Sequence, residues 1–298
     1  MPQNRQQYLQ PETLSRLKNM ELRARLVVEG FITGLHQSPY HGFSVEFAEH
    51  RQYMPGDPIR HVDWKVYGKT DRFYVKEYEE ETNLKGYILL DTSASMNYKS
   101  GAVSKLEYGA YLASALTYLM LKQRDAVGLG TFDQEVRRLL PPRSVMNYLH
   151  VILKELEHLT PGGETHIGNT LHELADRIHR RGLIIIMSDL LDDPEQVLSG
   201  LNHFRYRQHD VLVFHLLDPR EVDFAFDADA LFEDMETGEI INTQSWHVQS
   251  AYRQQVQDTI ETYKRGCREN RIDYIFMDTS QPLDQALSQY LIKRKRMR

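Results

Sequence analysis

Apolar segments that suit buried strands alternate with amphipathic helical segments from residue 84 onward. The clearest apolar runs lie at residues 183–187 and 211–217. Strands that are apolar on both faces and are separated by helices are typical of a doubly wound, mostly parallel sheet with helices on both faces. Such sheets bind ligands at the carboxyl ends of their strands. The sequence therefore predicts an α/β fold with its site at that edge of the sheet.

The alternation also places the individual elements. Strands are predicted at residues 87–91, 126–132, 136–140, 183–188, 211–217 and 273–277. Helices are predicted at residues 105–123, 145–158, 167–180, 194–208, 251–270 and 283–293.

The pattern before residue 84 is different. Apolar residues recur at mostly helical spacing over residues 11–36, which predicts one amphipathic helix. Residues 42–82 contain short alternating runs around the turn sequence Pro55-Gly56-Asp57-Pro58, which predicts a small β-rich appendage. The chain is thus expected to comprise the helix and appendage in residues 1–83 and the α/β domain in residues 84–298.

Composition excludes several classes of protein. The formal net charge of −6 argues against a general nucleic-acid binder, which needs a basic face. The single cysteine, Cys267, excludes an internal disulfide and a cysteine-based metal centre. It lies in a predicted helix rich in arginine and is interpreted as a packed or half-exposed bystander rather than a catalytic thiol. No apolar segment suits a signal peptide or a membrane span, so a cytoplasmic protein is expected.

Oxygen-bearing side chains gather where the predicted strands end. Asp91, Ser93 and Ser95 follow the first strand, and Asp189 follows the strand at residues 183–188. A third segment, Pro161-Gly162-Gly163-Glu164-Thr165, offers a hydroxyl beside two glycines that allow close backbone approach. Hard cations such as Mg²⁺ prefer oxygen ligands, so the three segments together predict a divalent-cation site.

Asp91, Ser93, Ser95, Thr165 and Asp189 together resemble the metal-ion-dependent adhesion site of von Willebrand factor A domains. The resemblance implies that the three hydroxyls bind Mg²⁺ or Mn²⁺, while the two carboxylates mainly hold coordinated waters. It also implies an open coordination position that accepts an acidic side chain of a partner protein. The sequence departs from many such domains in having Leu190, rather than glycine, after Asp189.

The appendage extends the resemblance to a family. Residues 43–57 and 60–65, together with residues 71–80 and the sequence Leu217-Asp218-Pro219-Arg220-Glu221, are similar to the bacterial proteins grouped as domain of unknown function 58. Membership implies an adaptor or co-chaperone role beside a MoxR-type AAA+ ATPase. Trp64 is interpreted as a core anchor of the appendage, and an ion-pair network is predicted to brace the appendage, with direct contact to a partner as the alternative. The network comprises Arg60, Asp63, Lys65 and Arg72.

These features predict a protein-binding module that depends on a divalent cation, rather than an enzyme. A phosphohydrolase with Asp91 as nucleophile is the first alternative, but Ser93 stands where such enzymes usually place a second acid. The second alternative is a purely structural scaffold whose oxygen cluster is empty. Nucleotide-binding loops are absent, and Asp176 replaces the second histidine of a zinc-protease helix that would begin at His172.

Charge is distributed unevenly near the end of the chain. Residues 218–239 contain nine acidic residues and one basic residue, and residues 293–298 are almost entirely basic. Both segments are interpreted as solvated surface, with electrostatic docking to a partner as the alternative for each.

Overall fold

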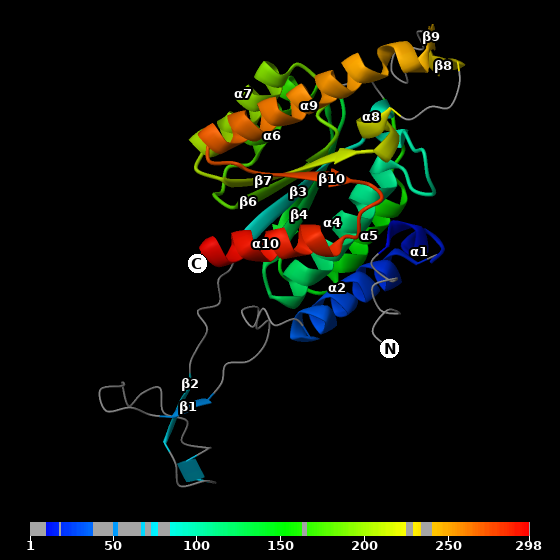
Figure 1. The fold of residues 1–298 in the computed structure, drawn as a ribbon. Coiled ribbons are helices and arrows are strands. Elements are labelled where there is room, and N and C mark those ends of the chain that lie inside the picture. Colours follow the sequence, from blue (N-terminus) through cyan, green and yellow to red (C-terminus); the bar gives the residue numbers. More distant parts are fainter. Residues whose placement is uncertain are drawn as a thin grey trace.

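A six-stranded sheet forms the centre of the molecule (Figure 1). The computed structural model describes residues 10–17, 19–37, 50–52, 67–68, 73–76, 84–162, 166–224, 229–233 and 240–297. The strand order is β10-β7-β6-β3-β4-β5, and only the edge strand β5 runs antiparallel to its neighbour. The strands are β3 (Lys85–Asp91), β4 (Ala126–Phe132), β5 (Val136–Arg143), β6 (Leu183–Ser188), β7 (Asp210–Leu217) and β10 (Asp273–Asp278). This confirms the predicted α/β fold class.

The strand order creates a switch point between β3 and β6. From β3 the chain builds outward through β4 and β5, then returns to β6 and builds the other half through β7 and β10. The loops that follow β3 and β6 therefore leave their strands toward opposite halves of the sheet. A crevice at such a point is where open α/β sheets bind ligands. Asp91 ends β3 and Ser188 ends β6, so the predicted site residues lie at this position.

Alternate residues of the central strands face two separate cores. Ile88 and Ile185 belong to the core beneath one layer of helices, whereas Leu89, Ile184 and Ile186 belong to the core beneath the other. Each of these five side chains is fully buried. Because successive strand residues point to opposite faces, a strand covered on both sides must be apolar at every position.

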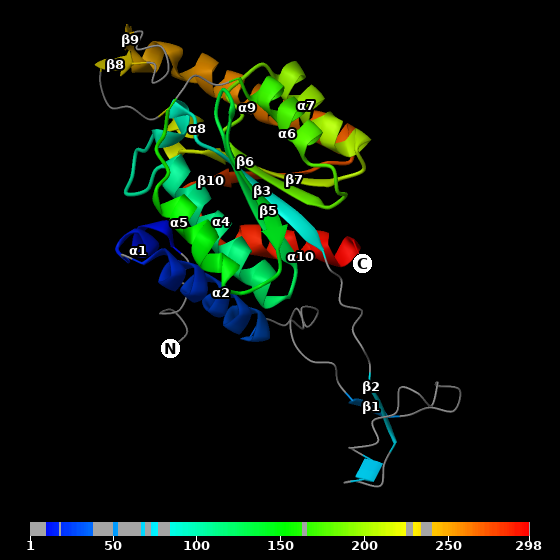
Figure 2. The same cartoon turned by 180° about the vertical axis from the view of Figure 1, so that it is seen from behind.

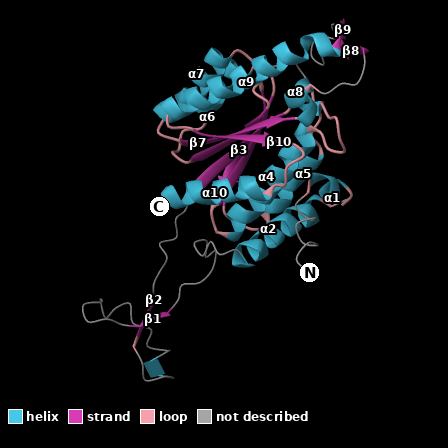
Figure 3. Ribbon diagram, in the orientation of Figure 1, coloured by secondary structure: helices cyan, strands magenta, loops and turns pink. Residues whose placement is uncertain are grey.

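Helices cover both faces of the sheet (Figures 2 and 3). One layer contains α4, α5 and α10, with α2 packed outside α4, and the other contains α6, α7 and α9. The helices are α4 (Lys105–Lys122), α5 (Tyr148–Glu157), α6 (Ile167–Arg177), α7 (Pro194–Tyr206), α9 (Ser245–Glu269) and α10 (Asp284–Arg296).

The N-terminal segment forms two helices rather than the single helix predicted over residues 11–36. They are α1 (Pro11–Ser15) and α2 (Met20–Gln37). The side chain of Asn19 accepts a hydrogen bond of 3.0 Å from the backbone N–H of Leu22, so it caps a new helix where the prediction continued the first one. Helix α2 then buries Val27, Val28 and Phe31 in the same core as α4.

The appendage is described only in part. Strands β1 (His50–Gln52) and β2 (Tyr74–Lys76) pair in antiparallel fashion, and the rings of Tyr67 and Phe73 stack with centroids 4.4 Å apart. The Pro55–Pro58 turn and the residues predicted to brace the appendage lie outside the described residues; those residues are Arg60, Asp63, Trp64, Lys65 and Arg72. Their roles stay predictions, as does the division of the chain at residue 83.

The acidic segment at residues 218–239 contains more structure than the interpretation as solvated surface allowed. It begins with α8 (Pro219–Asp223), and β8 (Asp229–Glu233) pairs with β9 (Ile240–Gln244) in antiparallel fashion. Asp218 is buried at the start of α8. Helix α9 follows β9 directly and starts six residues before the predicted position, at Ser245 rather than residue 251.

Two residues of the basic C-terminal segment are tied into the fold rather than solvated. Arg294 pairs with the fully buried Asp125 at 2.7 Å, and Lys293 pairs with Asp273 at 2.7 Å. Both basic side chains are only 11% exposed. Within the parts of the chain described, no helix is both long and apolar enough to cross a membrane.

The Arg294–Asp125 pair provides a test of this packing. Arg294→Ala removes the guanidinium that pairs with the buried carboxylate of Asp125. Because breaking a buried ion pair is costly, we expect the free energy of unfolding to fall by about 3–5 kcal/mol. Arg296→Ala is the matched control, because this side chain is 71% exposed and its pair with Asp273 spans 3.8 Å; its expected effect is about 0–1 kcal/mol. Denaturant unfolding measures both, and equal losses would contradict the assignment.

Candidate functional site

The loop after β3 brings three of the predicted residues together. Asp91 is fully buried, and its Oδ1 accepts a hydrogen bond of 2.9 Å from the backbone N–H of Ser93. The hydroxyl oxygens of Ser93 and Ser95 lie 3.0 Å apart. Thr92 holds the loop in place, because its backbone N–H and its hydroxyl both donate to the carbonyl of Phe132 at the end of β4. The end of β4 thus holds the loop after β3 in place.

The end of β6 lies beside this loop. The hydroxyl of Ser188 donates to Asp91 Oδ2 over 2.6 Å, which links the ends of the two central strands. Asp189 follows and is also fully buried. Both oxygens of Asp91 therefore have protein donors, so this carboxylate can act on a cation through water, as the resemblance implies, while its remaining lone pairs stay available.

The fifth predicted residue, Thr165, lies outside the described residues, as do Gly163 and Glu164. The described part of this segment does approach the site. The backbone N–H of Gly162 donates to the carbonyl of Thr92 over 3.0 Å. Gly162 thus lies beside the loop that contains Asp91 and Ser93.

Leu190 adopts the backbone conformation for which glycine is usual. Its φ is 52°, in the left-handed region, and its side chain is buried. Its carbonyl accepts a hydrogen bond of 2.8 Å from the hydroxyl of Tyr263 on α9. Burial and this hydrogen bond offset a conformation that costs a non-glycine residue roughly 1–2 kcal/mol. The loop after β6 therefore forms without the glycine found in many von Willebrand factor A domains.

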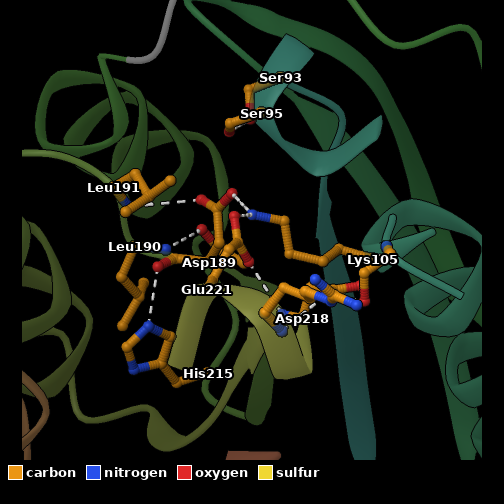
Figure 4. Close-up of polar contacts among 12 residues, drawn as sticks. Ser93, Ser95, Lys105, Asp189, Leu190, Leu191, His215, Asp218 and Glu221 are labelled. Carbon is orange, nitrogen blue, oxygen red and sulfur yellow. Dashed lines mark hydrogen bonds and ion pairs between the residues drawn. The ribbon is translucent and has the colours of Figure 1, made fainter. Parts of the chain in front are cut away.

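A buried lysine that the sequence analysis did not identify completes the site (Figure 4). Lys105 is the first residue of α4, and its side chain is fully buried. Its ammonium lies 2.8 Å from Asp189 Oδ2 and 2.5 Å from Glu221 Oε1. In the same view the Ser95 hydroxyl points toward the carboxylates of Asp189 and Glu221. The lysine thus joins the end of β6 to helix α8.

Helix α8 holds Glu221 in position through its cap. The side chain of Asp218 accepts from the backbone N–H of Arg220 over 2.9 Å, while Glu221 Oε2 accepts from the backbone N–H of Asp218 over 2.8 Å. Asp218 and Glu221 also form a capping box, in which the side chain of each accepts from the backbone N–H of the other. Asp218 also accepts hydrogen bonds from the backbone N–H and the hydroxyl of Ser100, in the loop that precedes α4. The segment Leu217–Glu221 therefore positions one of the two carboxylates that contact Lys105.

A neutral histidine supports the loop after β6. His215 Nε2 lies 2.8 Å from the carbonyl of Asp189, and its Nδ1 lies 2.6 Å from the hydroxyl of Tyr274. A carbonyl can only accept, so Nε2 carries the proton and Nδ1 accepts from Tyr274. Burial lowers the pKa of His215 to about 4. The imidazole is therefore uncharged at neutral pH and orients Asp189 without adding charge to the site.

Burial and mutual repulsion control the charges in the site. Burial, followed by the charge of Asp189, raises the pKa of Asp91 to about 7. Burial also raises the pKa of Glu221. Burial alone would lower the pKa of Lys105, but the charges of Asp189 and Glu221 outweigh that effect and raise it. The ammonium therefore stays charged at neutral pH.

The donor set fits a hard divalent cation held through hydroxyls and water. Two carboxylates, those of Asp189 and Glu221, contact the single ammonium of Lys105, and the carboxylate of Asp91 lies close enough to Asp189 to feel its charge. The fully ionised cluster therefore has an excess of negative charge that a divalent cation would balance. Across the described ranges, no three His, Cys, Asp or Glu side chains converge to hold a metal ion by themselves. Among the described residues, the hydroxyls of Ser93 and Ser95 would therefore have to contribute to holding a cation here.

Cys267 occupies the packed one of the two positions that the sequence left open. It is fully buried on α9, and burial raises the pKa of its thiol to about 12. Such a thiol is not a nucleophile at neutral pH.

Comparison with known proteins identifies similar sequences and structures. The family model described as "Protein of unknown function DUF58" matches residues 49–262. The uncharacterized protein Rv1480 of Mycobacterium tuberculosis is 26% identical over 232 residues, which cover 76% of this chain and 72% of that protein. The uncharacterized protein Mb1516 of Mycobacterium bovis matches with the same identity and coverage.

Solved structures show similarity at lower identity. The conserved hypothetical protein BatB from Bacteroides thetaiotaomicron is 19% identical with a TM-score of 0.49, over 72% of this chain and 99% of that chain. An aerotolerance-related membrane protein from Bacteroides fragilis is 21% identical with a TM-score of 0.48, over 70% and 99%. The VWA domain of SpRpn10 is 12% identical with a TM-score of 0.40, over 70% and 95%.

The raised pKa of Asp91 predicts a pH dependence of stability in the absence of metal. Between about pH 4 and pH 7 the folded protein retains a proton that the unfolded chain has released, so stability falls as pH rises through this window. Asp91→Asn keeps one acceptor oxygen for the backbone N–H of Ser93, places an amide N–H that can donate to the Ser188 hydroxyl in place of the other oxygen, and cannot ionise. The free energy of unfolding of the natural protein, minus that of the variant, is therefore expected to decrease with pH, by at most about 1.4 kcal/mol per pH unit.

Chemical unfolding in EDTA across this pH range measures the difference. Asp176→Asn is the control, because Asp176 has a side chain that is 60% exposed on α6, away from the site. A difference between the natural protein and Asp91→Asn that does not vary with pH would contradict the assignment.

Proposed function

Because this chain belongs to the family of proteins of unknown function DUF58, we propose that it is a protein-binding module whose switch-point site engages its partner through a divalent cation, Mg²⁺ or Mn²⁺. One observation carries the proposal. The hydroxyls of Ser93 and Ser95 lie together at the carboxyl ends of β3 and β6, beside a buried cluster with excess negative charge.

In this proposal Ser93, Ser95 and Thr165 supply hydroxyl ligands. Asp91 and Asp189 hold the ion mainly through water, which leaves it able to attract a further anionic ligand when bound. An Asp or Glu side chain of the partner would provide that ligand. Leu191 supports a protein partner, because this residue, two positions after Asp189, is 50% exposed and offers apolar contact at the rim of the site.

The partner that we propose is a MoxR-type AAA+ ATPase or its client. This part of the proposal is supported by the family resemblance of residues 43–65 and 217–221, and no contact in the described structure bears on it.

The geometry favours this role over phosphate-ester hydrolysis. A nucleophilic carboxylate needs an oxygen that the substrate can reach. Asp91 is fully buried, and its two oxygens already accept hydrogen bonds from Ser93 and Ser188. These contacts suit a residue that supports the loop and holds water.

Removing one hydroxyl tests the cation site. We expect protein stripped with EDTA to bind Mg²⁺ saturably in a calorimetric titration, and Ser93→Ala to weaken that affinity at least tenfold because a ligand oxygen is lost. Ser114→Ala is the matched control, since Ser114 is a buried serine of α4 that donates to the carbonyl of Tyr111. No binding at millimolar Mg²⁺, or equal binding by Ser93→Ala, would refute the cation site.

Capture of the partner tests the rest of the proposal. Immobilised chain is expected to retain a MoxR-type ATPase with trapped nucleotide in Mg²⁺, and to release it in EDTA or when Ser93 is replaced by alanine. Ser114→Ala should retain it. Equal capture in EDTA would show that the cation does not mediate binding, and absence of capture under every condition would exclude this partner.

A further inference from the structure

The ammonium of Lys105 is paired with one oxygen of Asp189, a carboxylate that the proposed cation site needs. It lies 2.8 Å from Asp189 Oδ2, and the other oxygen of that carboxylate accepts from the backbone N–H of Leu191 over 3.3 Å. The Lys105 and Asp189 side chains are both fully buried. Solvent therefore does not screen the interaction, and a second cation near Asp189 would experience the full repulsion of the ammonium.

Glu221 offers the ammonium an alternative partner. Its Oε1 lies 2.5 Å from Lys105 Nζ, and its side chain is 17% exposed. The capping box at the start of α8 fixes this carboxylate through its other oxygen. Lys105 can therefore give up Asp189 and stay paired, without leaving a buried ammonium unaccompanied.

We infer that Lys105 is an internal counter-ion that competes with the divalent cation for Asp189, and that Glu221 retains the ammonium when the cation binds. This inference rests on the proposed function. Lys105 is a positioning residue in this scheme, because it acts on the cation through Asp189. It sets the affinity of the site by stabilising the metal-free state.

Variants of the two partners are expected to change metal affinity in opposite directions. Lys105→Met removes the competitor, so Mg²⁺ should bind at least tenfold more tightly than to the natural protein. Glu221→Gln removes the alternative carboxylate and leaves the ammonium with Asp189 alone, so Mg²⁺ should bind at least tenfold more weakly. A purely structural role for either residue would not produce opposite shifts.

The double variant Lys105→Met/Glu221→Gln separates competition from overall charge. It has the same net charge as the natural protein, yet no ammonium faces Asp189. Competition predicts that the double variant binds Mg²⁺ at least tenfold more tightly than the natural protein. If only the summed charge matters, the two affinities would be equal, and the inference would be overturned.

Calorimetry with Mg²⁺, and separately with Mn²⁺, provides the affinities. Thermal unfolding in EDTA and in Mg²⁺ provides a second measure, because at one Mg²⁺ concentration tighter binding raises the unfolding temperature further. The same measurement shows which variants fold. The double variant guards against misfolding, since it leaves one fewer buried carboxylate unpaired than Lys105→Met does.

The outcomes distinguish the two proposals. Binding that Asp91→Ala abolishes but Lys105→Met does not tighten would overturn this inference and leave the proposed cation site intact. No binding of either cation by the natural protein or any variant would overturn both. Tighter binding by both methionine-containing variants and weaker binding by Glu221→Gln would establish the competition.

Discussion

The burial of opposite charges at the switch point is the constraint on which the site depends. Lys105 and Asp189 are both fully buried, and neither could stay ionised there alone. Their pairing fixes the start of α4 against the end of β6. Glu221 extends the pairing to α8, and the Ser188 hydroxyl extends it to Asp91 on β3. One charge cluster thus holds together the elements that meet at the switch point.

The surrounding fold maintains this cluster at a fixed position. β3 and β6 are adjacent and buried on both faces, so their carboxyl ends have little freedom to move apart. His215 and Tyr263 support the loop after β6 from β7 and α9 through hydrogen bonds to its carbonyls. The site therefore combines polar loops with a rigid base, an arrangement that suits a preformed binding site better than one assembled by its ligand.

The parts of the site that follow from local patterns could be predicted from sequence. Asp91 and Asp189 stand directly after apolar strands, and parallel strands end at one edge of a sheet. Lys105 could not be found in this way, because a lysine at the start of a helix is usually solvated, and its partners are 84 and 116 residues distant in sequence. Glu221 belongs to a sequence that resembles the family, but its position in an acidic run suggests a surface residue and gives no sign of its contact with Lys105. The break between α1 and α2 was missed for a similar reason. Apolar spacing alone continues one helix through Asn19, whereas the side chain of Asn19 caps the start of a second one.

Diffraction from crystals soaked in Mn²⁺ would test the central claim most directly, because the anomalous signal locates the ion independently of any partner. We expect a peak beside the hydroxyls of Ser93 and Ser95, with Lys105 Nζ withdrawn from Asp189 and retained by Glu221. An absence of anomalous signal at saturating Mn²⁺, with Lys105 still bound to Asp189, would contradict the account and identify the cluster as a structural ion-pair network.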